Sequence, residues 1–181
     1  MKVCSSVTFA NSEKPKTDPT ALFKLSYGLF VLTAKDGEKE NGCIINTAFQ
    51  GANEPTKIAI SCQKGNLTRE IIERTGKFNV SVLTDSVPFE TIRHFGMQSG
   101  RDVDKFKELG LTPEAPEVIS VPGIKELPLT LECKVVYKQQ QYPECMTDPE
   151  PPTHYPENSQ DIHADYHTAY YGQIVAAYMI E

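Results

Sequence analysis

The chain has 181 residues, of which 39% are hydrophobic and 23% charged, and its formal net charge is −6. This size and composition suit one globular domain with an ordinary core, and the recurring apolar, β-rich segments argue against intrinsic disorder. A nucleic-acid-binding protein would usually carry a surplus of Lys and Arg, and a membrane helix needs roughly 20 apolar residues in a row. The sequence has neither feature, so we expect no nucleic acid and no membrane among its partners.

The cysteines and the N-terminal segment indicate a reducing compartment. The cysteines are odd in number, widely scattered and without a C-x-x-C pair, which argues against a disulfide framework and against a zinc site; they are Cys4, Cys43, Cys62, Cys133 and Cys145. Residues 1–20 are polar and lack the long apolar region of a secretory signal. We therefore interpret residues 1–20 as an N-terminal arm and expect a cytoplasmic protein with reduced thiols.

The first part of the domain reads as three strands. Residues 27–33 are apolar and aromatic, and Asp36-Gly37 supplies a turn after them. A second strand is predicted over Gly42–Phe49 and a third over Lys57–Cys62. The spacing of the first two is typical of a hairpin.

A helix is well signalled after the third strand. Asn66 can cap its N-terminus, Ile71 and Ile72 belong to one apolar stripe, and Gly76 suits the left-handed residue that ends many helices. The alternating pattern of residues 78–83 then predicts a fourth strand.

A shorter helix is predicted over residues 87–94. Ser86 is the expected cap, Pro88 lies in the first turn, and Phe89 and Ile92 are expected to face inward.

The second half of the chain contains two strands separated by a long connection. Residues 96–128 look irregular, whereas residues 129–137 alternate like a half-buried strand and residues 168–180 are rich in Tyr, Val, Ile and Ala. Between these strands, residues 139–165 are proline-rich, carry carboxylates but no Lys or Arg, and are interpreted as an insertion that serves as a lid or partner-binding loop. Six or so strands with few helices favour a closed antiparallel barrel, and a two-sheet sandwich is the alternative.

Familiar catalytic motifs are missing from the sequence. It contains no P-loop, no G-x-G-x-x-G dinucleotide turn and no G-x-S-x-G nucleophile elbow. His163 and His167 are four residues apart, with Cys145 and His154 upstream, but a proline-rich loop without a second spaced pair favours solvated histidines over a metal site. We therefore predict no metal.

Three polar stretches are the candidates for a binding site. Asn46 and Thr47 interrupt an apolar strand, where polar groups need a ligand, water or backbone as partner, although an ordinary strand end explains them equally well. Residues 61–68 lead from a strand into a helix N-terminus, which is a common place for a phosphate. Residues 94–106 are rich in hydrogen-bond donors that could engage an anion, but a charged surface loop is the simpler interpretation of their composition.

Together these stretches resemble the flavin reductase-like family, whose members have an FMN-binding split β-barrel, and most closely its flavoredoxin-type members and the flavin domain of high-molecular-weight rubredoxins. The similarity covers residues 21–181, and its most specific part is Ser99-Gly100-Arg101-Asp102-Val103-Asp104-Lys105-Phe106. Further matching segments are residues 25–33, 41–47, 76–83 and 94–96, His167-Thr168 and Gly172.

The resemblance implies a homodimer that holds FMN in a groove near the subunit interface, with FAD a less favoured cofactor. The residues implied in cofactor binding are those of the ring strand (Cys43, Ile44, Ile45, Asn46 and Thr47), the phosphate stretch (Ser61, Cys62, Gln63, Lys64, Asn66 and Thr68) and the loop (Ser99, Gly100, Arg101 and Lys105). Lys64 and Lys105 are expected to face the phosphate. His167 is the candidate for lining the exposed flavin face, and the simpler interpretation is a core or loop histidine.

Two functions of different class follow from this resemblance. The first is an NAD(P)H-dependent flavin reductase, in which the flavin performs the redox chemistry and the protein binds and tunes it. The second is an electron-transfer flavoprotein that exchanges electrons with a redox-protein partner without using NAD(P)H. A binding barrel without turnover is a third interpretation.

Overall fold

The computed structural model describes residues 28–84, 87–142, 145 and 167–179, and every structural statement concerns this part of the chain. In chain order the elements are β1 (Phe30–Asp36), β2 (Lys39–Ile45), β3 (Ala48–Ala52), β4 (Lys57–Gln63), α1 (Leu67–Thr75), β5 (Lys77–Val82), α2 (Phe89–Met97), α3 (Lys105–Glu108), β6 (Pro113–Glu114), β7 (Gly123–Ile124), β8 (Leu129–Gln140) and β9 (His167–Met179). The structure therefore confirms a mainly β fold with few helices.

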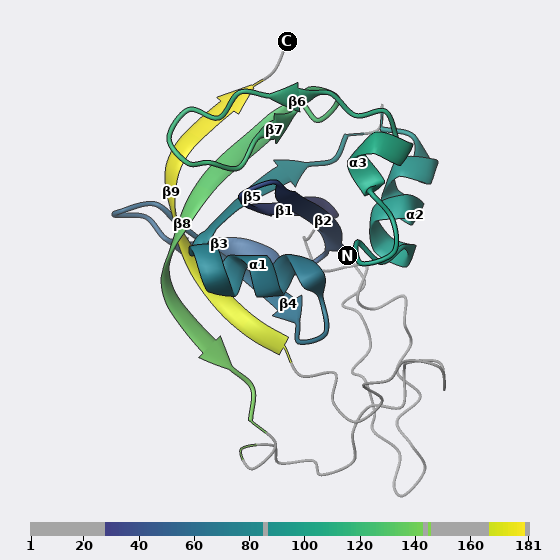
Figure 1. Cartoon of the computed structure of the whole chain (residues 1–181). Helices are drawn as coiled ribbons and strands as arrows, with labels where there is room; N and C mark the ends of the chain where they lie inside the picture. Colours follow the sequence, from purple (N-terminus) through teal and green to yellow (C-terminus); the bar gives the residue numbers. More distant parts are fainter. Residues whose placement is uncertain (1–27, 85–86, 143–144, 146–166, 180–181) are drawn as a thin grey trace, which may run out of the picture.

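Seven strands form one antiparallel sheet in the order β2-β1-β5-β8-β9-β4-β3. The two edge strands, β2 and β3, are consecutive in the chain and are joined by only Asn46 and Thr47. The sheet must therefore roll until its edges come together, which Figure 1 shows as a curved wall around the core. This is a barrel whose wall is split between β2 and β3, as the resemblance implies, and it excludes the two-sheet sandwich.

The barrel interior is filled by apolar side chains that alternate along the strands. Leu32 and Ala34 of β1 point into the main core with Phe78 and Val80 of β5, and all four are buried. Val31, on the opposite face of β1, packs in a second cluster beneath α2. Both faces of β1 are thus covered, which explains its continuous apolar run.

Helix α1 begins and ends where its sequence predicts. The Asn66 side chain accepts a hydrogen bond of 2.8 Å from the Thr68 N–H, and Gly76 adopts the left-handed conformation with φ 64°. Ile71 and Ile72 are buried against the barrel. In Figure 1 the helix lies beside β4, at the end of the barrel where β9 begins.

Helix α2 differs from its prediction in both its bounds and its inward face. It spans Phe89–Met97, and the buried residues on it are Thr91 and Phe95. Phe89 was expected to face inward, but it is 74% exposed, because it begins the helix outside the face formed by Thr91 and Phe95. The predicted cap, Ser86, lies outside the described residues.

The segment predicted to be irregular, residues 96–128, contains α3 and the β6–β7 hairpin. A buried carboxylate fastens this segment to the barrel: Glu132 of β8 accepts hydrogen bonds of 2.6–2.9 Å from the backbone N–H groups of residues 117–119. Asn79 of β5 donates to the carbonyls of Val121 and Pro122, both at 2.9 Å. Side chain to backbone hydrogen bonds therefore fix a region that has no periodic pattern.

Two further predictions differ from the structure in the bounds of their strands. The predicted strand over Gly42–Phe49 is two strands, because the ladder breaks at Asn46 and Thr47. Strand β8 extends to Gln140, and most of the insertion predicted over residues 139–165 lies outside the described residues, as does the arm of residues 1–20. Among the described helices none is long and apolar enough to cross a membrane.

Candidate functional site

The three polar stretches, far apart in the sequence, meet at one end of the barrel. Thr47, at the split between β2 and β3, contacts Ser61 of β4. The chain then continues through Lys64 into the N-terminus of α1, and Arg101 from the third stretch reaches the Gly65 carbonyl there. The fold therefore brings together the segments that the sequence selects as a binding site.

Asn46 and Thr47 are exposed at this split rather than buried within a strand. The Thr47 hydroxyl donates to the Ser61 carbonyl at 2.9 Å, and the Thr47 carbonyl accepts from the Ser61 N–H at 3.2 Å. Thr47 thus takes the backbone as its partner. Asn46 lies on the surface beside it.

The N-terminus of α1 presents a polar rim. Asn66 caps the helix, and the buried Thr68 hydroxyl accepts a hydrogen bond of 2.9 Å from the Asn41 side chain of β2. The exposed Lys64 adds a positive charge just before the helix. Helix N-termini carry partial positive charge and unpaired N–H groups, so this rim is chemically suited to an anion.

The loop of residues 99–101 closes over this rim. A Cβ on Gly100 would lie 1.9 Å from the Asn41 Oδ1, so only glycine allows the loop to approach so closely. Ser99 accepts a hydrogen bond of 3.2 Å from the Arg101 N–H, and Arg101 forms an ion pair of 2.6 Å with Glu70 of α1. This hydrogen bond from Arg101 lowers the pKa of Glu70 below its ordinary value.

Lys105 is buried behind the site and not on its surface. Its side chain is 3% exposed, and its ammonium donates hydrogen bonds of 2.9 Å to the carbonyls of Gly42 in β2 and Phe95 in α2. Burial lowers the pKa of this ammonium. Lys105 was expected to face a phosphate; with these partners we assign it instead to holding β2 against α2.

The remaining candidate residues of β2 and β4 do not belong to the polar rim at the α1 N-terminus. Cys43, Ile45 and Cys62 are core residues, so a ligand beside them would meet backbone atoms. Ile44 is half-buried in the cluster beneath α2. Strand β2 is an edge strand of the sheet, and the outward backbone groups of an edge strand are available for hydrogen bonding.

His167 begins β9 and pairs with Gln63, the last residue of β4. Its backbone N–H donates to the Gln141 side chain at 2.9 Å, and the residue is half-buried. It therefore lies at the same end of the barrel as the α1 N-terminus. The described part of the chain contains no group of three or more His, Cys, Asp or Glu side chains placed to hold a metal ion.

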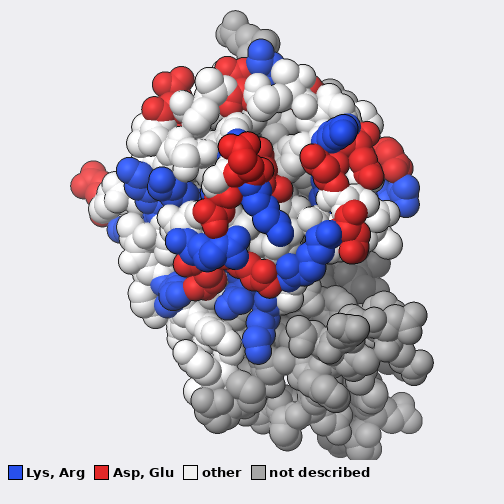
Figure 2. Space-filling view, in the orientation of Figure 1, with Lys and Arg blue, Asp and Glu red and all other residues white. Residues whose placement is uncertain are grey.

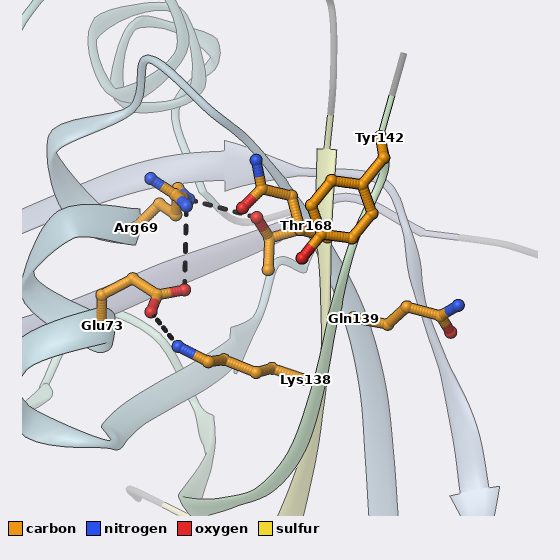
Figure 3. A pocket seen from close by; sticks show the side chains of 7 residues that line it. Arg69, Glu73, Lys138, Gln139, Tyr142 and Thr168 are labelled. Carbon is orange, nitrogen blue, oxygen red and sulfur yellow. Dashed lines mark hydrogen bonds and ion pairs between the residues drawn. The ribbon is translucent and has the colours of Figure 1, made fainter. Parts of the chain in front are cut away.

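A pocket of about 300 Å³ lies beside this end of the barrel, and most of its residues were not selected from the sequence. It is lined by Arg69, Glu73, Lys138, Gln139, Gln140, Tyr142 and Thr168. Figure 3 shows Arg69 directed at both Thr168 and Glu73, with distances of 3.2 Å and 3.8 Å, and Lys138 directed at Glu73. These residues come from α1, β8 and β9, so only the folded topology reveals their proximity.

Glu73 is the charge that organises this pocket. Burial alone would raise its pKa, but hydrogen bonds from Lys138 and Tyr170 outweigh burial and hold the pKa below its ordinary value. The pocket wall therefore contains two cations, Arg69 and Lys138, that share the Glu73 carboxylate. On the face drawn in Figure 2, the Lys and Arg side chains likewise lie interspersed with Asp and Glu.

A family model described as the flavin reductase like domain matches residues 22–181. The chain belongs to this family. Two curated relatives are similar to part of the chain, and one solved structure shares its fold. A high molecular weight rubredoxin of Moorella thermoacetica is 47% identical over 89 residues, covering 49% of this chain and 39% of the relative. A ferric-chelate reductase (NAD(P)H) of Archaeoglobus fulgidus is 37% identical over 89 residues, covering 49% of this chain and 53% of the relative.

The matched regions thus span about half or less of these two relatives. The flavoredoxin of Desulfovibrio vulgaris (Miyazaki F) has a TM-score of 0.66 at 23% identity, covering 86% of this chain and 70% of that chain. At this identity the likeness is one of fold. It agrees with the rolled antiparallel sheet described above.

Proposed function

We propose that this flavin reductase-like protein binds FMN at the end of the barrel where β2, β4, β9 and α1 meet, and that it transfers electrons from NAD(P)H through the flavin to an acceptor. The observation that carries the proposal is the convergence of the three polar stretches on the α1 N-terminus, in a chain of this family. FAD is the less favoured cofactor, because nothing in the sequence provides an adenine site.

The donor chemistry of the rim fits a flavin phosphate. Lys64 supplies a cation, and Asn66 and Thr68 lie in the helix entry, where backbone N–H groups and the helix dipole favour an anion. Ser99, Gly100 and Arg101 close the rim from the other side. These residues would hold the phosphate, with Lys105 acting only through the Gly42 carbonyl.

The edge strand fits the ring of a flavin. The backbone of Cys43, Ile44 and Ile45 would bind the polar edge of the ring, with the side chains of Asn46 and Thr47 beyond it. When bound, the flavin supplies the redox chemistry, accepting a hydride and passing electrons on. The protein orients the ring, and backbone N–H groups stabilise charge on the reduced form.

We propose NAD(P)H as the electron donor for two reasons, which are the name of one relative and the position of His167. The Archaeoglobus relative is named as an NAD(P)H-dependent reductase. His167 lies at the same end of the barrel and is proposed to line the open flavin face. We further propose that the protein acts as a homodimer in the cytoplasm.

The second candidate is an electron-transfer flavoprotein that serves a redox protein and does not use NAD(P)H. The 47% identity to part of a high molecular weight rubredoxin favours it. Anaerobic mixing of the FMN-loaded protein with NADH or NADPH separates the two candidates. Bleaching of the flavin absorption by one equivalent of NADH or NADPH, with oxidation of the nucleotide, supports the reductase. Bleaching by dithionite alone, with no oxidation of either nucleotide, would refute NAD(P)H use and leave the electron carrier.

A further inference from the structure

The pocket between α1, β8 and β9 has an uncompensated positive charge. Arg69 and Lys138 line it, and Glu73 is the single acidic residue among the described residues of its wall. Two cations and one carboxylate leave one positive charge, and the other lining residues are neutral: Gln139, Gln140, Tyr142 and Thr168. The pocket is therefore better suited to an anion than to a cation.

Arg69 has N–H groups that its contacts leave unused. Its Nε donates to the Thr168 hydroxyl at 3.2 Å, and Nη1 donates to the Lys64 carbonyl at 3.5 Å. Nη2 lies 3.8 Å from the Glu73 carboxylate, which is longer than a hydrogen bond. Of the five N–H groups of a guanidinium, these contacts within the described chain engage two. The side chain is 16% exposed, so an anion that binds it is partly shielded from water and held more strongly.

Glu73, in contrast, has both carboxylate oxygens engaged. The Tyr170 hydroxyl donates to Oε1 at 2.5 Å, and the Lys138 ammonium donates to Oε2. In dinucleotide-binding folds a carboxylate binds the ribose 2′-hydroxyl of NAD, whereas an arginine accommodates the 2′-phosphate of NADP. Because the unused groups here belong to Arg69 and not to Glu73, the pocket matches a phosphorylated ribose.

The pocket adjoins the rim where the flavin is proposed to bind. Arg69 lies in the first turn of α1 and contacts the Lys64 carbonyl, and Thr168 follows His167 in β9. We propose that Arg69 and Lys138 bind the ribose 2′-phosphate of NADPH, so that NADPH is preferred to NADH as electron donor. The inference rests on the proposed function, which places the nicotinamide at the flavin beside His167.

The test is calorimetric titration of the FMN-loaded protein with adenosine 2′,5′-bisphosphate, and with 5′-AMP, which lacks the 2′-phosphate. We expect the bisphosphate to bind about tenfold or more tightly than 5′-AMP, since charge-assisted contacts to the phosphate are lost with 5′-AMP. Arg69→Met and Lys138→Met should each weaken the bisphosphate about ten- to a hundredfold, with little effect on 5′-AMP or on FMN. Arg74→Met is the matched control, because Arg74 is an exposed arginine of the same helix that pairs with Asp36 outside the pocket. It should leave all three affinities unchanged.

Equal affinities for the bisphosphate and 5′-AMP would overturn the proposal, as would an unchanged bisphosphate affinity in both Arg69→Met and Lys138→Met. A loss of FMN affinity in these variants as large as the loss of bisphosphate affinity would also overturn it, because the pocket would then hold the flavin phosphate.

Anaerobic reduction of the flavin separates this inference from the proposed function. Equal bleaching by NADH and NADPH, without selective binding of the bisphosphate, would overturn the inference and leave the reductase. Selective binding of the bisphosphate that depends on Arg69 and Lys138, without bleaching by either nucleotide, would support the phosphate site and refute the reductase.

Discussion

Replacing Lys105 by Met tests whether this lysine supports the flavin strand from behind or contacts the phosphate. Methionine keeps an apolar stem of similar length but removes the ammonium that donates to Gly42 and Phe95. Both carbonyls then lose their donor in a buried place, at a cost of about 1–3 kcal/mol each. The relief of burying a charge offsets part of this loss. We expect the free energy of unfolding to fall by about 2–4 kcal/mol.

The assay is urea unfolding at pH 7 followed by circular dichroism, with Lys107→Met as the control, because Lys107 is an exposed neighbour on α3. The control should change stability by less than about 0.5 kcal/mol. Affinities of the Lys105→Met variant for FMN and riboflavin should fall by the same factor, since the change acts through β2 and not through the phosphate.

The opposite pattern would refute this reasoning. If Lys105→Met leaves stability within about 0.5 kcal/mol of the original protein and weakens FMN but not riboflavin, then the ammonium contacts the phosphate. An equal loss of affinity for FMN and riboflavin with an unchanged free energy of unfolding would also contradict the account. The loss of the donor to the two buried carbonyls would then have had no effect on stability.

The other predictions concern stability and are measured by urea unfolding. Glu132→Gln exchanges a carboxylate that accepts three backbone N–H groups for an amide with one oxygen, so we expect a loss of about 2–4 kcal/mol; an unchanged midpoint would contradict this. Gly100→Ala places a methyl group 1.9 Å from Asn41 Oδ1 and should cost about 1–3 kcal/mol, whereas equal stability would show that the loop moves freely. Burial raises the pKa of Cys133 to about 12 from 9.0, so the unfolded chain loses its proton first and stability falls as pH rises above 9, by about 1.4 kcal/mol at pH 10. Cys133→Ala should lack this part of the slope, and identical pH profiles for the two proteins would disprove it.

Elements with a local signal were predictable from the sequence. The cap Asn66 and the terminal Gly76 define α1, and both act in the structure as their chemistry requires. The strands of the sheet follow from alternation, and the barrel follows from their number. The position of Asn46 and Thr47 at the split between β2 and β3 was harder to predict from the sequence, because the apolar pattern continues through this break.

Features that depend on tertiary contacts could not be read from the sequence. The burial of Lys105 is set by two carbonyls from distant elements, and nothing in a run of charged residues distinguishes a buried lysine from a solvated one. The pocket of Arg69, Glu73 and Lys138 assembles only when α1 meets β8. The inward face of α2 was misjudged because a short helix with few apolar residues fits more than one orientation, and Phe89 proved to be exposed.

The most direct test of the proposed function is equilibrium titration of flavin fluorescence with FMN and riboflavin, for the original protein and for Lys64→Met. Lys39→Met is the control, because this exposed lysine lies at the far end of β2. We predict quenching of FMN at micromolar protein, and a loss of about ten- to a hundredfold in FMN affinity for Lys64→Met, with riboflavin nearly unaffected. Absence of quenching with the original protein, or equal losses for FMN and riboflavin in Lys64→Met but not in Lys39→Met, would contradict the placement of the flavin phosphate at the N-terminus of α1.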